Sequence, residues 1–500
     1  MSEPTEADRL ARATRTGLSW SFLGAVVTNV IRVAMVAVLG RVLDSRDFGI
    51  VAAAISVNVL FYSVRDLGIG RALVQLKDVD RAHLQTAFAV STYLGLVISG
   101  ALALTAPLIA DLYRIPAATD VIRVLGLLFV LRGVAITSRM QCQRAMRFRF
   151  IALIDQASFA LGSAVSVVLA VAGAGPWALA IGYLVEEGTS TLGYLVASPP
   201  PYAIRFSVAK LRDLMRFGTG ETVSQVVATL ATYGDNFVVG HALGSSMLGY
   251  YTRAYDLIKF PSTVFDMIAG NVLFPVFSRF QDDADRLAAG LRRATFVNGL
   301  ILLPASTLLL IAAPEAIRLL MGPGWDESVL PFRVLALTIL MRTGWKVGAL
   351  VASAAGKIQG VAIVNTVYMI CVIGGALGSV HWGIVGVAAS TAVAIAVTYV
   401  GTTYLALQVS GLSALAMLKA HVPGMVLASL VVVVAYPLTT FLRGLMHPIA
   451  ILGLSTAAAI GISLVAVLLG TRSGRGDFGW LAEEIARVRR RARPAGVTGA

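Results

Sequence analysis

The chain has 500 residues, of which 57% are hydrophobic and only 14% are charged, and its mean hydropathy is +0.79. A soluble core cannot bury so large an apolar share, and runs of about 20 apolar residues indicate membrane spans. The net charge of +14 does not indicate a nucleic-acid partner, because the basic residues lie in loops between apolar stretches, as they do in membrane proteins.

About fourteen apolar stretches along the chain are long enough to cross a membrane. They lie at residues 17–39, 48–75, 85–110, 119–136, 151–172, 176–197, 218–239, 248–277, 291–312, 329–355, 358–379, 383–407, 421–441 and 448–470. Only helices and closed barrels can span a bilayer, and stretches of this length are helical. The sequence therefore predicts an all-α integral membrane protein with about 14 transmembrane helices.

The Lys and Arg residues between these stretches fall mostly in alternate loops. One set of loops holds Arg runs near residues 9–15, 139–149, 205–216 and 279–293, together with the Arg-rich tail. The opposite set holds only Arg41, Arg46, Arg114, Arg123, Arg318 and Arg443. Cytoplasmic loops carry the excess of positive charge, so we expect a multi-pass protein with both termini in the cytoplasm.

Two segments outside the predicted spans are amphipathic. Residues 206–217 (FSVAKLRDLMRF) and 477–493 (DFGWLAEEIARVRRRAR) place apolar side chains on one helical face and basic side chains elsewhere. Both patterns favour helices that lie on an anionic cytoplasmic leaflet, which makes membrane lipids expected partners. For the tail segment, a solvated arm is an equally good interpretation.

The two halves of the chain resemble each other. A shift of 200 residues (238 minus 38) places residues 38–49, VLGRVLDSRDFG, on residues 238–249, VVGHALGSSMLG, and also aligns Asp66 with Asp266. A shift of 210 residues (334 minus 124) aligns Arg132 with Arg342. Each half holds about six predicted spans, an even number, so the halves share one orientation. Transporters built from such parallel repeats bind substrate near the membrane midplane.

The repeat and the spans together predict the domain organisation. We expect two pseudo-symmetric six-helix lobes followed by two C-terminal helices. The segments are a cytoplasmic N-terminal tail (1–16), an N-lobe (17–197), an amphipathic cytoplasmic linker (198–217), a C-lobe (218–407), two further helices (408–470) and a basic cytoplasmic tail (471–500).

Several basic residues fall inside the predicted spans, where each would cost about 2.5–3.5 kcal/mol if it faced lipid at the midplane. Five lie deep in their helices: Arg32, Arg65, Arg132, Arg342 and Lys346. One interpretation is internal pairing with acidic residues of the spans. The other is a cationic lining for an anionic substrate, because guanidinium groups form strong bidentate contacts with phosphate. The sequence leaves both open.

Acidic residues inside the spans have a similar pair of interpretations. Glu186 and Glu187 lie in the middle of the sixth predicted helix, and Asp235 lies in the seventh. These three are candidates for binding a coupling ion or carrying a proton. Ion pairing with the buried arginines, including Arg65, is the alternative.

Residues 235–257 (DNFVVGHALGSSMLGYYTRAYDL) and 271–283 (NVLFPVFSRFQDD) resemble the Wzx-type polysaccharide flippases, which belong to the multidrug/oligosaccharidyl-lipid/polysaccharide exporter superfamily. Residues 41–53, followed by DLGIGRALVQ at 66–75, are similar to the same family. The resemblance covers most of residues 17–286 and, more loosely, the remaining helices.

This resemblance implies a two-lobed bundle in the bacterial cytoplasmic (inner) membrane. It implies that alternating access between the lobes moves an undecaprenyl-pyrophosphate-linked oligosaccharide to the outer leaflet, for cell-surface polysaccharide biosynthesis. A polysaccharide polymerase and glycosyltransferases are candidate partners. The lipid II flippase relatives are known for a cationic cavity, which agrees with the arginines found here.

Motifs for catalysis are weak. The DVD sequence at 78–80 is similar to the metal-binding motif of glycosyltransferases but lies in a short loop, and VASAAGKI at 351–358 lacks the first glycine and the Ser/Thr of a phosphate-binding loop. We therefore expect no enzyme, no metal site and no cofactor. The alternative functions are an ion-coupled multidrug antiporter of the same superfamily and, less favoured, a membrane polysaccharide polymerase or ligase. An antiporter would need an acidic cavity, and a polymerase a large external loop.

Overall fold

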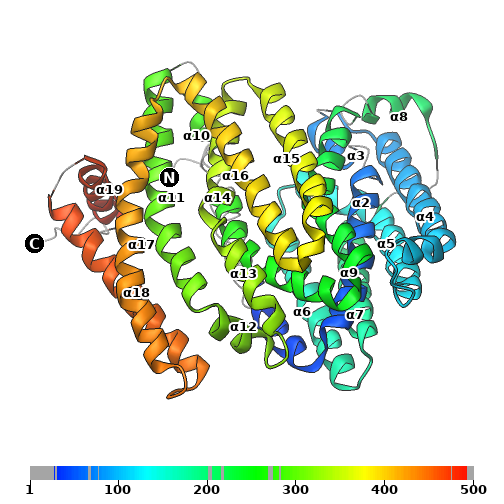
Figure 1. The fold of residues 1–500 in the computed structure, drawn as a ribbon. Coiled ribbons are helices and arrows are strands. Elements are labelled where there is room, and N and C mark those ends of the chain that lie inside the picture. Colours follow the sequence, from blue (N-terminus) through cyan, green and yellow to red (C-terminus); the bar gives the residue numbers. More distant parts are fainter. Residues whose placement is uncertain are drawn as a thin grey trace, which may run out of the picture. The chain divides into compact units, whose positions relative to one another are not determined.

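The computed structural model describes residues 28, 31–65, 69–76, 78–200, 205–215, 219–268, 274–280, 283–473 and 476–492. Regular structure in these residues is helical throughout, and no strand occurs among them (Figure 1). The prediction of an all-α protein is confirmed. Residues 1–16, most of the predicted first helix, Asp66 and the end of the basic tail lie outside the described residues.

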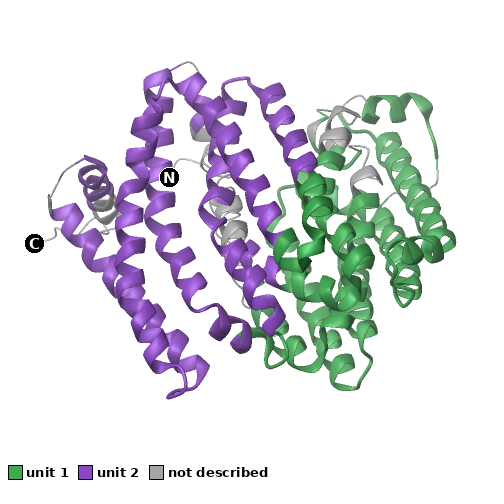
Figure 2. Cartoon of the chain, in the orientation of Figure 1, with its two compact units in different colours: residues 1–253, 320–325, 372–387 green, residues 254–319, 326–371, 388–500 purple. Residues whose placement is uncertain are grey.

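The chain divides into two compact units (Figure 2). Unit 1 comprises residues 1–253, 320–325 and 372–387. Its helices are α2 (Ser45–Arg65), α3 (Ile69–Gln75), α4 (Arg81–Leu112), α5 (Ala118–Arg144), α6 (Phe148–Val171), α7 (Pro176–Ala197), α8 (Val208–Met215) and the first part of α9 (Thr219–Ile268). A further helical stretch at residues 31–42 precedes α2.

Unit 2 comprises residues 254–319, 326–371 and 388–500. Its elements are the end of α9, α10 (Phe274–Arg279), α11 (Ala284–Ile311), most of α12 (Ala313–Met321), η2 (Asp326–Ser328), α13 (Val329–Ala336), α14 (Ile339–Ala354), the first part of α15 (Ile358–Ser379), most of α16 (Gly383–Ser410), α17 (Ala414–Leu442), α18 (Pro448–Ser473) and α19 (Gly476–Ala492). These units follow packing rather than sequence repeats, and they differ from the predicted lobes in placing residues 218–253 in unit 1. The lobes therefore stay a prediction.

Eight helical stretches of the described chain are long and apolar enough to cross a membrane, or nine if α13 and α14 form one bent span. One stretch, Ile358–Ser410, has 53 residues and would be about 80 Å long as a single helix. It contains α15 and α16, separated by the 3₁₀ turn η3 (Val380–Trp382), and so supplies two spans. Helix α9 likewise consists of two helices that meet at Gly244, where φ is 82°. The protein is a multi-pass membrane protein, and the count of about 14 spans stays a prediction.

Small residues bring α6 and α7 together. The buried positions on α6 are Ser158, Gly162, Ser163, Ser166 and Ala170. Gly162 faces both Gly182 and the Cβ atom of Glu186 on α7. Membrane helices associate through such small-residue faces, because close backbone approach maximises dispersion contacts. This packing places the middle of α7, including Glu186, against α6.

The predicted linker helix docks on its own unit. In α8, Leu214 is buried in a cluster with Ile69, Ala72, Leu73 and Ala87, which come from α3 and α4. Lys210 Nζ lies 2.8 Å from Asp80 Oδ2. Asp80 is also the N-cap of α4 and accepts the backbone N–H of His83 at 2.8 Å. Asp80, in the DVD sequence, thus has a structural role in holding α8 and starting α4.

The first turns of the tail helix α19 pack inside unit 2. Phe478 and Leu481 join a cluster around Phe296 of α11, with the Phe296 and Phe478 ring centroids 5.2 Å apart. Arg292 of α11 forms an ion pair with Asp477, with 2.7 Å between the guanidinium nitrogen and the carboxylate oxygen. This part of the tail is therefore a docked helix, which excludes the alternative of a fully solvated arm.

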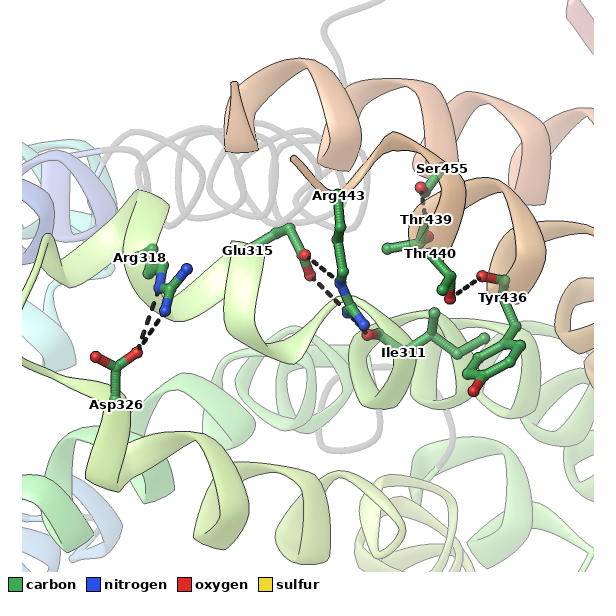
Figure 3. A network of polar contacts seen from close by, with 9 residues as sticks. All are labelled: Ile311, Glu315, Arg318, Asp326, Tyr436, Thr439, Thr440, Arg443 and Ser455. Atoms are coloured by element: carbon green, nitrogen blue, oxygen red, sulfur yellow. Dashed lines mark hydrogen bonds and ion pairs between the residues drawn. The ribbon is translucent and has the colours of Figure 1, made fainter. Parts of the chain in front are cut away.

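A polar network closes one end of unit 2 (Figure 3). Arg443, at the end of α17, donates from Nε to Glu315 Oε1 at 2.8 Å and from a terminal nitrogen to the Ile311 carbonyl at 3.0 Å. Glu315 is only 5% exposed. Thr439 on α17 and Ser455 on α18 share a buried hydrogen bond of 2.9 Å. The network fixes the α17–α18 hairpin to the junction of α11 and α12.

Candidate functional site

A cluster of charged side chains lies inside unit 1, on α5, α6 and α7. Arg132 Nε on α5 donates to Glu187 Oε2 on α7 at a distance of 2.7 Å. The Arg132 guanidinium also stacks on Tyr62 of α2, 5.0 Å from the ring centroid. Glu187 is well buried, with 18% of its side chain exposed. Of the two interpretations of Arg132, internal ion pairing is the one the structure shows.

Glu186 differs from its neighbour Glu187. Successive helical residues point about 100° apart, so Glu186 does not share the Arg132 ion pair. No hydrogen bond or ion pair to its side chain is formed within the part of the chain that the structure describes. Arg132 and Arg32 are close enough to act on its carboxylate, and Glu187 and Asp155 repel it. Glu186 is therefore a half-buried carboxylate surrounded by charges of both signs.

Asp155 on α6 belongs to the same charged cluster and contacts two further side chains. It accepts from Arg139 at 3.3 Å and from the hydroxyl of Tyr194 at 2.8 Å, and Tyr194 is 1% exposed. Arg32 lies over the Phe159 ring, 5.6 Å from its centroid. When all these groups are ionised, the three arginines Arg32, Arg132 and Arg139 balance the carboxylates of Asp155, Glu186 and Glu187. Among the described side chains, this cluster therefore has equal numbers of positive and negative groups.

Sequence reasoning missed Asp155, Tyr62 and Tyr194. Asp155 lies inside the predicted span 151–172, so the search that found the buried arginines would also have found this carboxylate. The partners of Arg65 are a different matter: α2 ends at Arg65, but its side chain lies outside what the structure describes. The pairing of Arg65 with Glu186 or Glu187 therefore stays a prediction. The structure shows that Glu187 already forms an ion pair with Arg132.

A second cluster of buried charge lies inside unit 2. Arg342 on α14 is 7% exposed, and its guanidinium lies 4.8 Å from the ring centroid of Tyr255 on α9. Lys259 Nζ lies 4.2 Å from the same ring and 3.8 Å from Asp256. Lys346 is half-buried one turn along α14, on the face that carries Arg342. Arg342 and Lys259 thus lie against the same aromatic ring, and Lys346 lies one turn along α14 from Arg342.

Asp235 joins a hydrogen-bond network between α2 and α9. It is 1% exposed and accepts the hydroxyl of Tyr251 at 2.6 Å and the backbone N–H of Asn236 at 2.9 Å. Asn236 in turn donates to Ser56 on α2 at 3.1 Å. These contacts give Asp235 a structural role, and coupling-ion binding by Asp235 stays a prediction. In the described ranges, no group of three or more His, Cys, Asp or Glu residues could hold a metal ion.

A bundle of apolar helices with charge gathered inside it is the architecture of membrane transporters, and solved structures share this fold. The chain superposes on the lipid II flippase MurJ in an inward closed conformation with a TM-score of 0.74 at 14% identity, covering 91% of this chain and 99% of that one. It superposes on an inward-facing multidrug transporter of the MATE family with a TM-score of 0.62 at 16% identity, covering 77% and 95%. The class of protein is therefore a multi-pass membrane protein with the fold of these transporters.

The chain belongs to the polysaccharide biosynthesis protein family, whose model matches residues 38–330, more than half of the sequence. It is 28% identical to the lipopolysaccharide biosynthesis protein WzxC of Escherichia coli (strain K12), over 69% of this chain and 71% of that protein. It is 26% identical to the succinoglycan biosynthesis transport protein ExoT of Rhizobium meliloti (strain 1021), over 66% of each. The predicted resemblance to Wzx-type proteins is confirmed, as is the prediction of a transporter rather than an enzyme.

Proposed function

We propose that this protein translocates a lipid-linked oligosaccharide across the bacterial cytoplasmic membrane for the synthesis of a cell-surface polysaccharide. The observation that carries the proposal is the family match over residues 38–330, on a chain whose fold resembles that of a lipid flippase. Glycosyltransferases that complete the oligosaccharide and a polymerase that consumes it are the partners this function requires. The positive-charge distribution of the loops supports cytoplasmic termini.

The cationic cluster of unit 2 fits the lipid diphosphate. Arg342 and Lys346 lie on one face of α14, and Lys259 of α9 lies over the same Tyr255 ring as Arg342. Basic side chains deep in a membrane bundle are costly and are typical of substrate and ion pathways. A diphosphate is an anion that a guanidinium can bind through two parallel hydrogen bonds. We therefore assign Arg342 and Lys346 to substrate binding.

The charged cluster of unit 1, in which arginines and carboxylates lie together, suits ion coupling better than substrate binding. Arg132 already forms an ion pair with Glu187, so it is not freely available to a phosphate, and a role of Arg32 in substrate binding stays a prediction. Glu186, by contrast, has two arginines close by and forms no ion pair with either, which is an arrangement that tolerates both the charged and the protonated state. We assign Glu186 to coupling of transport to a proton gradient, with Glu187 and Arg132 as its fixed neighbours.

The test is transport by the purified protein in liposomes. We expect it to move a fluorescent oligosaccharide attached to a polyprenyl diphosphate, and not the same sugar on a neutral lipid. Arg342→Ala should lower the rate about tenfold or more, since hydrogen bonds to charged groups contribute about 1.5–3 kcal/mol. Arg342→Lys should retain part of the rate, and Arg472→Ala, at an exposed position of α18, serves as the control.

Two outcomes would contradict the proposal. One is transport of a cationic dye in place of the lipid-linked sugar, which would favour the multidrug antiporter. The other is transport that does not distinguish the diphosphate lipid from the neutral lipid.

A further inference from the structure

Three consecutive residues of α14 face three different helices of unit 2. Arg342 lies against α9, Thr343 contacts α11, and Gly344 packs on α16. The Thr343 hydroxyl donates to Oδ1 of Asn298 on α11 at 2.8 Å. A Cβ atom built on Gly344 would lie 2.5 Å from the ring of Tyr399 on α16. Successive helical residues point about 100° apart, so the three contacts span about 200° around α14 and restrict its rotation about its axis.

Asn298 holds α14 with both ends of its side-chain amide. Besides accepting from Thr343, it donates from Nδ2 to the Leu340 carbonyl at 3.4 Å. Asn298 is 7% exposed, and Thr343 is fully buried. A buried amide is costly unless both its donor and its acceptor have partners. The two contacts form together only in one register of α11 against α14, so Asn298 fixes that register.

The contacts of α11 lie on both sides of a break in the span. Helices α13 and α14 are bent by 42° where Ala336 ends one and Ile339 begins the other. The last carbonyls of a helix have no donor within it, and the Ser306 hydroxyl of α11 donates to the Ala336 carbonyl at 2.5 Å. Ser306 follows Asn298 by about two turns of α11. Helix α11 therefore sets the direction in which α14 leaves the break, and Arg342 lies in the first turn of α14.

The direction of α14 matters for a guanidinium group that binds a phosphate. A helix with its side chains has a radius of about 5–6 Å, so a rotation of about 10° moves a side chain by about 1 Å. Paired hydrogen bonds from a guanidinium to two phosphate oxygens need both N–H groups aligned, and a poorly aligned hydrogen bond is weak. Arg342 can therefore use both hydrogen bonds only while α14 keeps its register with α11.

We propose that Asn298 is a positioning residue of the diphosphate site, which acts through Arg342 by fixing the first turns of α14 against α11. The proposal rests on the proposed function, because it takes Arg342 as a ligand of the lipid diphosphate. Asn298 carries no charge, so its effect on an anionic substrate is indirect. Its removal should loosen the site and leave folding intact, since the Thr343 hydroxyl can then donate to the Leu340 carbonyl, 3.0 Å away in its own helix.

The first test measures transport of the polyprenyl diphosphate sugar in liposomes at several concentrations of that lipid. Asn298→Leu, of similar size, should raise the apparent KM about threefold to tenfold, as expected when a hydrogen bond to a charged group is weakened, and should change the maximal rate little. Asn298→Gln, which keeps both the donor and the acceptor, should recover part of the affinity. Thr398→Val is the matched control, since Thr398 is 1% exposed on α16 and its hydroxyl donates to the Ala394 carbonyl of the same helix.

A double variant shows whether Asn298 acts through Arg342. In an Arg342→Ala chain, Asn298→Leu should raise the KM no further, whereas any change in the thermal unfolding midpoint should be the same in both chains. The same increase of KM in both chains, or an unchanged KM in folded Asn298→Leu, would overturn the proposal. Failure of the proposed function would differ from both, because the unmodified protein would then not transport the lipid.

The second test needs no substrate. A cysteine in place of Lys346, which is half-buried, reports the position of α14 in a chain that also carries Cys142→Ser and Cys371→Ser. A small thiol reagent should react with this cysteine several-fold faster in detergent when Asn298→Leu is present, because α14 is then no longer fixed against α11. Thr398→Val should leave the rate unchanged. An unchanged rate in folded Asn298→Leu would show that Asn298 does not position α14, whatever the protein transports.

Discussion

At the scale of single residues, Glu186 and Glu187 of unit 1 differ in their ion pairing, and this difference decides which of them can take up a proton. The two are adjacent on α7, yet among the residues that the structure describes only Glu187 has an arginine within hydrogen-bonding distance. Burial makes an unpaired charge costly, so a carboxylate without a fixed partner gains from being protonated in part of a transport cycle. The neighbouring Arg132–Glu187 ion pair keeps its charges throughout, because the guanidinium of Arg132 cannot lose its proton.

Glu186→Gln should leave folding intact and remove the response of transport to a proton gradient. The amide has almost the same size and cannot titrate, and no ion pair is lost. The measurement is the transport rate in liposomes with and without an imposed pH difference, beside the thermal unfolding midpoint. A variant that still responds to the gradient would rule out Glu186 as the proton carrier.

Arg132→Ala should instead destabilise the protein. It leaves the buried Glu187 carboxylate without its partner, and loss of one member of a buried ion pair costs about 3–5 kcal/mol. Because Arg132 is 37% exposed, solvent screening reduces the expected loss to roughly 1–3 kcal/mol. Unfolding in detergent measures it. Adding Glu187→Gln should recover most of the stability, and a double variant as unstable as Arg132→Ala would contradict the ion-pair explanation.

At the scale of elements, the sequence could specify helices more readily than the contacts between them. Apolar stretches of membrane length located most of the spans, because length and hydropathy are properties of each segment alone. The partners of Arg342 and Arg132 could not be derived in the same way. Tyr255 and Tyr62 contact them across helices, and such contacts depend on how each helix is rotated about its axis.

The attachment of α8 should depend on the charge of Asp80. Its hydrogen bond with Lys210, followed by the backbone N–H of His83, holds the pKa of Asp80 far below its usual range. A carboxylate whose pKa is lowered by folding stabilises the folded form above its unfolded pKa of about 3.9 and loses that contribution as the pH falls towards its folded value. Amide protons of α8 should therefore stay protected from exchange between about pH 7 and pH 5 and lose protection only below about pH 4.

Asp80→Asn gives the matching variant test for α8. The amide cannot pair with the charge of Lys210, so exchange of the α8 amides should be faster at neutral pH and should no longer change with acidification below about pH 4. Asp78→Asn is the control, since Asp78 is exposed on the same loop. Equal exchange in the two variants would show that the Leu214 contact alone holds the helix.

At the scale of the whole molecule, the sequence showed that the chain contains a repeat, but it did not show which equivalent segments are in contact. Matching residues 38–49 with 238–249 predicted related halves. In the structure, Gly49 packs against the backbone of Ser245 and Gly249 packs against the backbone of Ser45, and these two contacts are related by the same offset of 200 residues. Packing nevertheless places residues up to Arg253 in unit 1, because the start of the second half contacts the start of the first. Sequence similarity shows which segments are equivalent, and it does not show which of them touch in a given state.

The predicted orientation of the chain rests on the distribution of its basic residues. These residues are concentrated in alternate loops, and the positive-inside rule therefore predicts that α8 lies in the cytoplasm and the turn that contains η2 lies outside. Cysteines at Ala209 of α8 and at Glu327 of η2, both exposed, report the two sides in a chain without Cys142 and Cys371. In intact cells, an impermeant thiol reagent should label Glu327→Cys and not Ala209→Cys, and permeabilised cells should show labelling of both. Labelling of both positions from outside would break the predicted alternation of loops. Labelling of Ala209→Cys alone would show that the protein has the opposite orientation.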